Sequence, residues 1–132
     1  MRSLRPFVCC AIVIVLAACD STSPASTLEL GGWGGEHVGL FVESASVTFL
    51  FDCAGGSSNG SIPLASDGSF DVTGTYVNGG NAFGIDHTPH AARYMGRVTG
   101  THITFTRILL DGSLPDATFT ADFGVPPGII AC

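Results

Sequence analysis

The chain has 132 residues, enough for one small domain, and carries 11 acidic residues against five basic ones, all of them arginine. The acidic balance argues against nucleic-acid binding, which needs a basic face, and the length excludes a two-domain enzyme. With 45% hydrophobic and only 12% charged residues, the composition is that of a folded rather than a disordered protein.

The N-terminal residues have the pattern of a secretory signal peptide. Two arginines within residues 1–5 precede an apolar run over residues 6–16, and Leu16-Ala17-Ala18 then leads to Cys19. An apolar run of this length suits the core of a cleaved signal helix and is too short to span a bilayer comfortably. The alternative is a retained N-terminal anchor helix.

The sequence Leu16-Ala17-Ala18-Cys19 resembles the lipobox of bacterial lipoproteins. The resemblance implies that Cys19 receives a diacylglyceryl group and becomes the first residue of the mature chain, after removal of residues 1–18. The partner is then the lipid bilayer, bound through acylated Cys19, and the location is the cell envelope. Asp20 resembles the inner-membrane retention signal of enterobacterial lipoproteins, although the choice between inner and outer membrane stays open.

A polar segment separates Cys19 from the body of the protein. Residues 19–27 are rich in serine and threonine and include Pro24, which is typical of a flexible tether. Removing residues 1–18 also removes Arg2 and Arg5, so the mature chain is more acidic still. We therefore expect the lipid, rather than the protein surface, to hold the domain of residues 28–132 at the membrane.

The body shows the two-residue periodicity of half-buried β-strands. Apolar and polar residues alternate in several runs, and turn signals such as Asp67-Gly68, Asn78-Gly79 and Asp111-Gly112 fall between them. The expected strands cover residues 37–43, 46–53, 59–63, 69–77, 92–99, 102–110, 117–123 and 128–132. We predict an all-β fold, a small antiparallel meander barrel of about seven or eight strands, with a two-sheet β-sandwich as the alternative.

Two short motifs support the barrel. Gly31-Gly32-Trp33 precedes the first long expected strand and resembles the start of the lipocalin and avidin barrels, the calycin group; Gly74-Thr75-Tyr76 resembles a strand of avidin-like proteins. The resemblance implies that Trp33 closes one barrel end. It does not extend to biotin binding, because Trp33 is the only tryptophan and an avidin-like site uses several.

The cysteines predict one disulfide. Cys9 and Cys10 leave with the signal peptide and Cys19 takes lipid, so Cys53 and Cys132 remain. Export to an oxidising compartment favours pairing of these two. The alternative is a thiol metal or catalytic site, which a C-terminal cysteine without a neighbouring histidine motif does not favour.

Four residues are candidates for ligand binding. Trp33, Glu36 and His37 surround a glycine-rich run and could shape a pocket at a barrel end; alternatively, Trp33 plugs the barrel and His37 bonds a carbonyl. Arg107 is in phase with the inward-facing Ile103 and Phe105. Either a bulge turns Arg107 outward, or it is a buried cation that needs a carboxylate or an anionic ligand.

Catalytic and metal motifs are weak. Asp86, His87 and His90 could share a metal ion, but Pro89 disfavours the helix that would align them, and a polar loop is the simpler interpretation. Ser58 lies in a G-x-S-x-G sequence without the helix that such a nucleophile needs. We expect no catalytic residue, no resident metal and no cofactor.

Three functions remain open. The first is a membrane-tethered, non-enzymatic domain that binds a small ligand or another envelope protein, which a barrel cavity would favour. The second is a structural or accessory lipoprotein with a solid interior, which would be filled by Phe49, Phe51, Phe70, Phe105 and Phe119. The third is a small metal-dependent or hydrolytic enzyme, which would require His37, His87 and His90 to converge.

Overall fold

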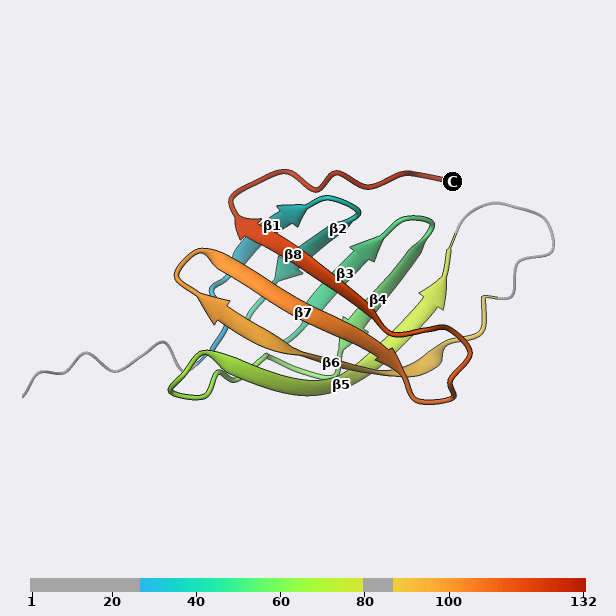
Figure 1. Ribbon diagram of the computed structural model, residues 1–132, viewed down its shortest axis with the longest axis horizontal. Coiled ribbons are helices and arrows are strands. Elements are labelled where there is room, and N and C mark those ends of the chain that lie inside the picture. Colours follow the sequence, from blue (N-terminus) through green and yellow to red (C-terminus); the bar gives the residue numbers. More distant parts are fainter. Residues whose placement is uncertain (1–26, 80–86) are drawn as a thin grey trace, which may run out of the picture.

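The protein is a closed antiparallel β-barrel in a computed structural model that describes residues 27–79 and 87–132. Each strand pairs with its sequence neighbours, and β1 pairs with β8 to close the sheet (Figure 1). The strands are β1 (Gly31–Gly35), β2 (Val38–Val42), β3 (Val47–Phe51), β4 (Ala54–Ser58), β5 (Ser69–Asn78), β6 (His90–Thr99), β7 (His102–Leu109) and β8 (Ala117–Phe123).

The prediction of an all-β meander barrel is confirmed, and the two-sheet sandwich is wrong because one sheet closes on itself. Two expected strands are wrong, and one observed strand is missing from the prediction. No strand was expected at Gly31–Gly35, where β1 lies; residues 59–63 lie after β4 (Ala54–Ser58), and residues 128–132 form no strand. Pro63 and Gly128 make only isolated bridges, to Thr27 and Glu36 respectively.

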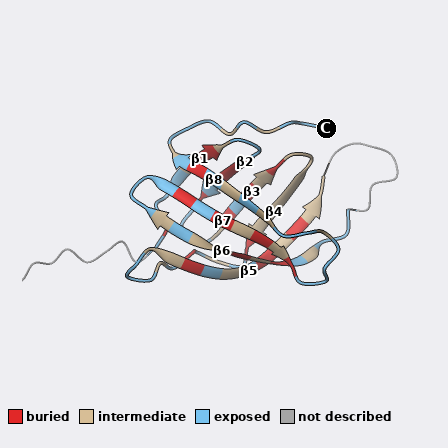
Figure 2. Ribbon diagram, in the orientation of Figure 1, coloured by how far each residue is buried: buried red, intermediate tan, exposed pale blue. Residues whose placement is uncertain are grey.

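Aromatic side chains occupy the barrel interior, as the alternation of inward and outward residues requires. The rings of Phe49 and Tyr94 stack with centroids 4.0 Å apart, and Phe49 also contacts Phe105 at 5.4 Å. Phe119 lies 4.9 Å from Phe51. Phe49, Phe51, Phe70 and Phe105 are buried and Phe119 packs against them, so the side chains expected to fill a solid barrel do lie together in its core. Figure 2 shows the buried residues distributed along the strands.

Close packing of the sheet depends on glycine at a few inward positions. A Cβ at Gly56 of β4 would lie 2.5 Å from the carbonyl oxygen of Thr75 and would also overlap the hydroxyl of Tyr94. That hydroxyl donates a 2.6 Å hydrogen bond to the same carbonyl oxygen. Burial raises the pKa of Tyr94, which keeps the hydroxyl protonated as a donor.

The two ends of the barrel carry different connections. In a meander, the β1–β2, β3–β4, β5–β6 and β7–β8 connections all lie at one end, and the other three lie at the opposite end. After β8 the chain turns at Gly124 and runs back along the barrel as residues 124–132, which we call the strap. Figure 1 shows the strap passing β1 and β2.

Candidate functional site

Two tight turns build a cluster of polar contacts at the end of the barrel where β1 meets β2. Glu36-His37 joins β1 to β2, and Asp52-Cys53 joins β3 to β4. The second residue of each turn has a left-handed backbone, with φ of 63° at His37 and 53° at Cys53. This conformation is uncommon for residues other than glycine, and the short turns impose it.

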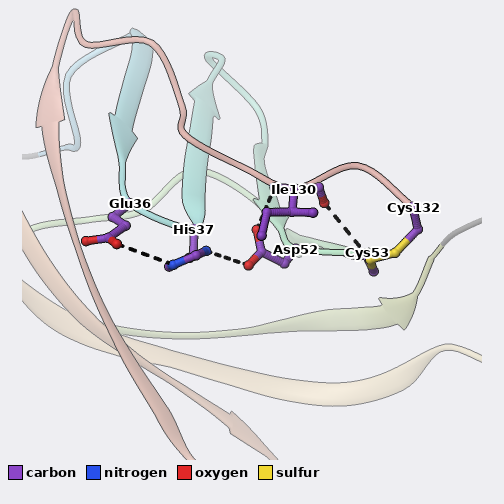
Figure 3. Close-up of polar contacts among 6 residues, drawn as sticks. All are labelled: Glu36, His37, Asp52, Cys53, Ile130 and Cys132. Atoms are coloured by element: carbon purple, nitrogen blue, oxygen red, sulfur yellow. Dashed lines mark hydrogen bonds and ion pairs between the residues drawn. A yellow bond between two sulfur atoms is a disulfide. The ribbon is translucent and has the colours of Figure 1, made fainter.

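The two turns are joined through an acid–base pair. The Nδ1 atom of His37 lies 2.5 Å from Oδ2 of Asp52, and its Nε2 atom lies 3.5 Å from the carboxylate of Glu36. The His37 side chain is about half exposed and that of Glu36 is 89% exposed. Figure 3 shows this row of side chains. The sequence pointed to His37 and Glu36 but not to Asp52, which comes from a different hairpin.

Asp52 also holds the strap. Its Oδ1 atom accepts a 2.7 Å hydrogen bond from the backbone N–H of Ile130, and the N–H of Cys53 donates to the carbonyl of Ile130 at 3.2 Å (Figure 3). Cys53 and Cys132 lie at disulfide distance, with Cα atoms 5.2 Å apart, so the predicted pairing is confirmed. We call Glu36, His37, Asp52, Cys53, Ile130 and Cys132 together the clamp.

Trp33 does not belong to the clamp. Its indole is 1% exposed, it packs edge-on against Phe123 at 5.2 Å, and its Nε1–H donates to the carbonyl of Glu29 at 3.2 Å. These contacts are those of a residue that fills the barrel interior. Of the expected pocket residues, Trp33 therefore lies in the core, while Glu36 and His37 lie at the surface.

Arg107 points into the barrel, and the strand register continues through it without a bulge. It is 8% exposed, and its Cζ atom lies 4.8 Å from the ring centroid of Tyr76 and 5.8 Å from that of Phe51. One terminal N–H donates to the carbonyl of Pro115 at 2.9 Å. The buried Nε has no hydrogen-bond partner, and no carboxylate of residues 27–79 or 87–132 pairs with the guanidinium.

The two histidines that were weak candidates for a metal site have separate partners. His87 contacts the carbonyl oxygen of Asn78 at 2.9 Å, and Nδ1 of His90 lies 2.6 Å from the carboxylate of Asp111. Asp86 lies outside the described residues. Within the described part of the chain, no group of three or more His, Cys, Asp or Glu side chains could hold a metal ion.

Two other polar groups have structural partners. The hydroxyl of Ser58 accepts a 2.9 Å hydrogen bond from the N–H of Val47 and donates to the carbonyl of Gly60, which ties β4 to β3. The hydrogen bond from His90, with a second from the N–H of Ser113, holds the pKa of Asp111 below its usual range. Ser58 thus ties β4 to β3, and Asp111 fastens the β7–β8 connection to β6.

Among residues 27–79 and 87–132, the structure contains no helix that is long and apolar enough to cross a membrane. Comparisons with protein-family models, with curated proteins and with solved structures found no match to this chain.

Proposed function

We propose that this protein is a lipid-anchored accessory module of the bacterial cell envelope, without catalytic activity, whose barrel acts through its outer surface. The anchor rests on Leu16-Ala17-Ala18-Cys19 at the end of an apolar run. Two acyl chains on Cys19 would give durable membrane attachment, whereas a single chain gives only marginal binding. The confirmed cysteine pair is in keeping with an exported domain, because disulfides persist in oxidising compartments.

The filled barrel is the observation that favours this function over storage of a small ligand inside the barrel. Side chains such as Phe49, Tyr94 and Phe105 stack across the region that a ligand would occupy. A chamber for a small ligand is normally a concave pocket of about 300–1,000 Å³. We therefore infer that the outer surface of the barrel binds another envelope component.

The anchor is tested by replacing Cys19 with serine and following the protein into the detergent phase of a cloud-point extraction. Cys19→Ser should abolish detergent partitioning and leave the signal peptide uncleaved, because the peptidase requires the lipidated thiol. Cys10→Ser, in the apolar run, is the matched control and should partition like the wild type. Equal partitioning of Cys19→Ser and the control would overturn the lipid anchor.

Arg107 supports a second function, the binding of a small anion at the barrel end. A buried guanidinium without a carboxylate is costly, and its free Nε–H offers a charge-assisted hydrogen bond. An anion that binds only the folded state raises the melting temperature. Phosphate or acetate should therefore stabilise the wild type more than sodium chloride of equal ionic strength, and Arg107→Met should lose this response. The same response in both proteins would reject the site.

A further inference from the structure

The chain contains two Asn-Gly pairs, and the fold places them in opposite surroundings. Asn59-Gly60 follows β4 in the connection to β5, whereas Asn78 is the last residue of β5 and Gly79 comes directly after it. An asparagine before glycine can lose ammonia spontaneously, because glycine has no side chain to hinder attack of its backbone nitrogen on the preceding side-chain amide. The reaction needs a free backbone N–H and a peptide unit that can rotate, so the fold decides which pair can react.

The Asn59-Gly60 pair is exposed and loosely held. A Cβ at Gly60 would meet no atom within 4 Å, so there is open space around this peptide unit. Among residues 27–79 and 87–132, no acceptor takes a hydrogen bond from the N–H of Gly60. The side-chain amide of Asn59 makes one long contact, 3.4 Å from its Nδ2 to Oγ1 of Thr73. The hydroxyl of Ser58 donates to the carbonyl of Gly60, and this is the contact that a rotation must loosen.

The Asn78-Gly79 pair is held in place. The N–H of Gly79 donates to the carbonyl of Cys53 at 2.7 Å, so the nitrogen that would attack is engaged. Asn78 pairs with Ala54 in the β4–β5 ladder, and a Cβ at Gly79 would lie 3.4 Å from Cα of Ala54. A hydrogen-bonded N–H packed against a strand becomes reactive only after local opening. We therefore expect this pair to be protected while the protein is folded.

We propose that Asn59 is a modification site, at which spontaneous deamidation produces aspartate and isoaspartate in the folded protein while Asn78 is spared. The backbone nitrogen of Gly60 loses its proton to hydroxide and attacks Cγ of Asn59. The side-chain nitrogen leaves as ammonia after it takes a proton from water. Water then opens the resulting succinimide ring at either carbonyl. One water molecule is consumed and one ammonia is released, and nothing is oxidised or reduced.

The surroundings of Asn59 suit the hydrolytic step, and they show what the product changes. A surface hollow at this point is lined by Asn59, Gly60, Ser61, Asp71, Val72 and Thr73. Asn59 and Asp71 are exposed, so water reaches the ring once it has formed. The product adds a negative charge beside Asp71, which is paired with Arg93. Isoaspartate also lengthens the backbone directly after β4.

Comparison of the two pairs in the same molecule tests the proposal. The full chain is incubated in its folded state at mildly alkaline pH and is then digested with pepsin in acid, where deamidation stops. Mass spectrometry of the peptides quantifies conversion at each site. Asn59 should convert at least about tenfold faster than Asn78, because the protected pair reacts only in rare open states. In denaturant with a reductant, both pairs should convert at similar rates, because the fold no longer distinguishes them.

Gly60→Ala tests whether the Gly60 nitrogen is the attacking group. The added methyl group meets no atom of the fold but hinders attack on Asn59, so conversion should slow about tenfold. Ser61→Ala, one residue further along, is the matched control and should convert at the rate of the wild type. The proposal is wrong if Asn59 converts no faster than Asn78 in the folded protein, or if Gly60→Ala leaves the rate at Asn59 unchanged.

Discussion

Trp33 is the largest fully buried side chain of the barrel, and it joins β1 to β8 through its contact with Phe123. Truncation would leave a cavity that the stiff surrounding strands fill only in part. We expect Trp33→Ala to lower the free energy of unfolding by about 3–5 kcal/mol, measured by denaturant titration. Leu110→Ala is the control: Leu110 is 58% exposed, and its loss should stay within about 0.5 kcal/mol. A loss below about 1 kcal/mol for Trp33→Ala would contradict the role of Trp33 in the core.

The lowered pKa of Asp111 predicts that the protein loses stability in acid. Its pKa lies below the ordinary 3.8 in the folded protein, mainly because of the hydrogen bond from His90. A group with a depressed folded pKa contributes stability above its unfolded pKa, and that contribution disappears as the pH falls through the folded pKa.

Asp111→Asn should therefore reduce the difference in melting temperature between pH 6 and pH 2.5, and it should do so by lowering the value at pH 6. Thermal unfolding followed by circular dichroism gives both temperatures. The exposed Asp116 provides a matched asparagine control that should behave as the wild type. If Asp111→Asn and the wild type show the same change of melting temperature with pH, the predicted contribution of Asp111 to stability is wrong.

At the scale of elements, β4 depends on the absence of a side chain at Gly56. The position is enclosed by the Thr75 carbonyl and the Tyr94 hydroxyl, so alanine there would overpack the sheet. We expect Gly56→Ala to destabilise the protein by about 1–3 kcal/mol, as measured by chemical denaturation. Gly60→Ala lies in open space and should change stability by less than about 0.5 kcal/mol. Equal effects of the two variants would show that the barrel adjusts at β4.

The sequence predicts best those strands that carry β-branched and aromatic residues in alternation. The range 117–123 coincides with β8, and β5, β6 and β7 were placed within two residues at each end. In contrast, β1 and β4 contain Gly-Gly pairs, so they lack the two-residue hydrophobic signal. Their strand conformation comes from pairing with neighbours, which no local pattern reveals.

In the clamp, too, the sequence reveals only those residues that carry a local signal. The disulfide followed from counting cysteines, and His37 stood out as a histidine in a glycine-rich run. Asp52 and Ile130 carried no such signal, because they lie 78 residues apart and meet only through the return of the strap. Arg107 was recognised as an inward cation by its phase, but its contacts with Tyr76 and Pro115 depend on three-dimensional packing.

At the scale of the whole molecule, the Cys53–Cys132 bond connects the β3–β4 turn to the end of the strap across a separation of 79 residues. Such a long loop restricts the unfolded chain strongly. Cys132→Ser should therefore lower the free energy of unfolding by about 2–5 kcal/mol under oxidising conditions. A dithiol reductant should lower the wild type to the level of the variant and leave the variant unchanged. Equal stability of the oxidised wild type and Cys132→Ser would contradict a stabilising role.

Closure of the barrel by its first and last strands also determines when the protein can fold. The β1–β8 ladder joins Trp33 to Phe123 and Gly34 to Asp122, so the sheet stays open until the C-terminal quarter of the chain is available. Small domains whose contacts join residues far apart in the sequence fold slowly, typically in about milliseconds to seconds. A nascent chain that ends before β8 exposes two unpaired strand edges, which are templates for aggregation. The barrel can therefore close only after β8 has been synthesised, and every truncation before Phe123 should be prone to aggregate.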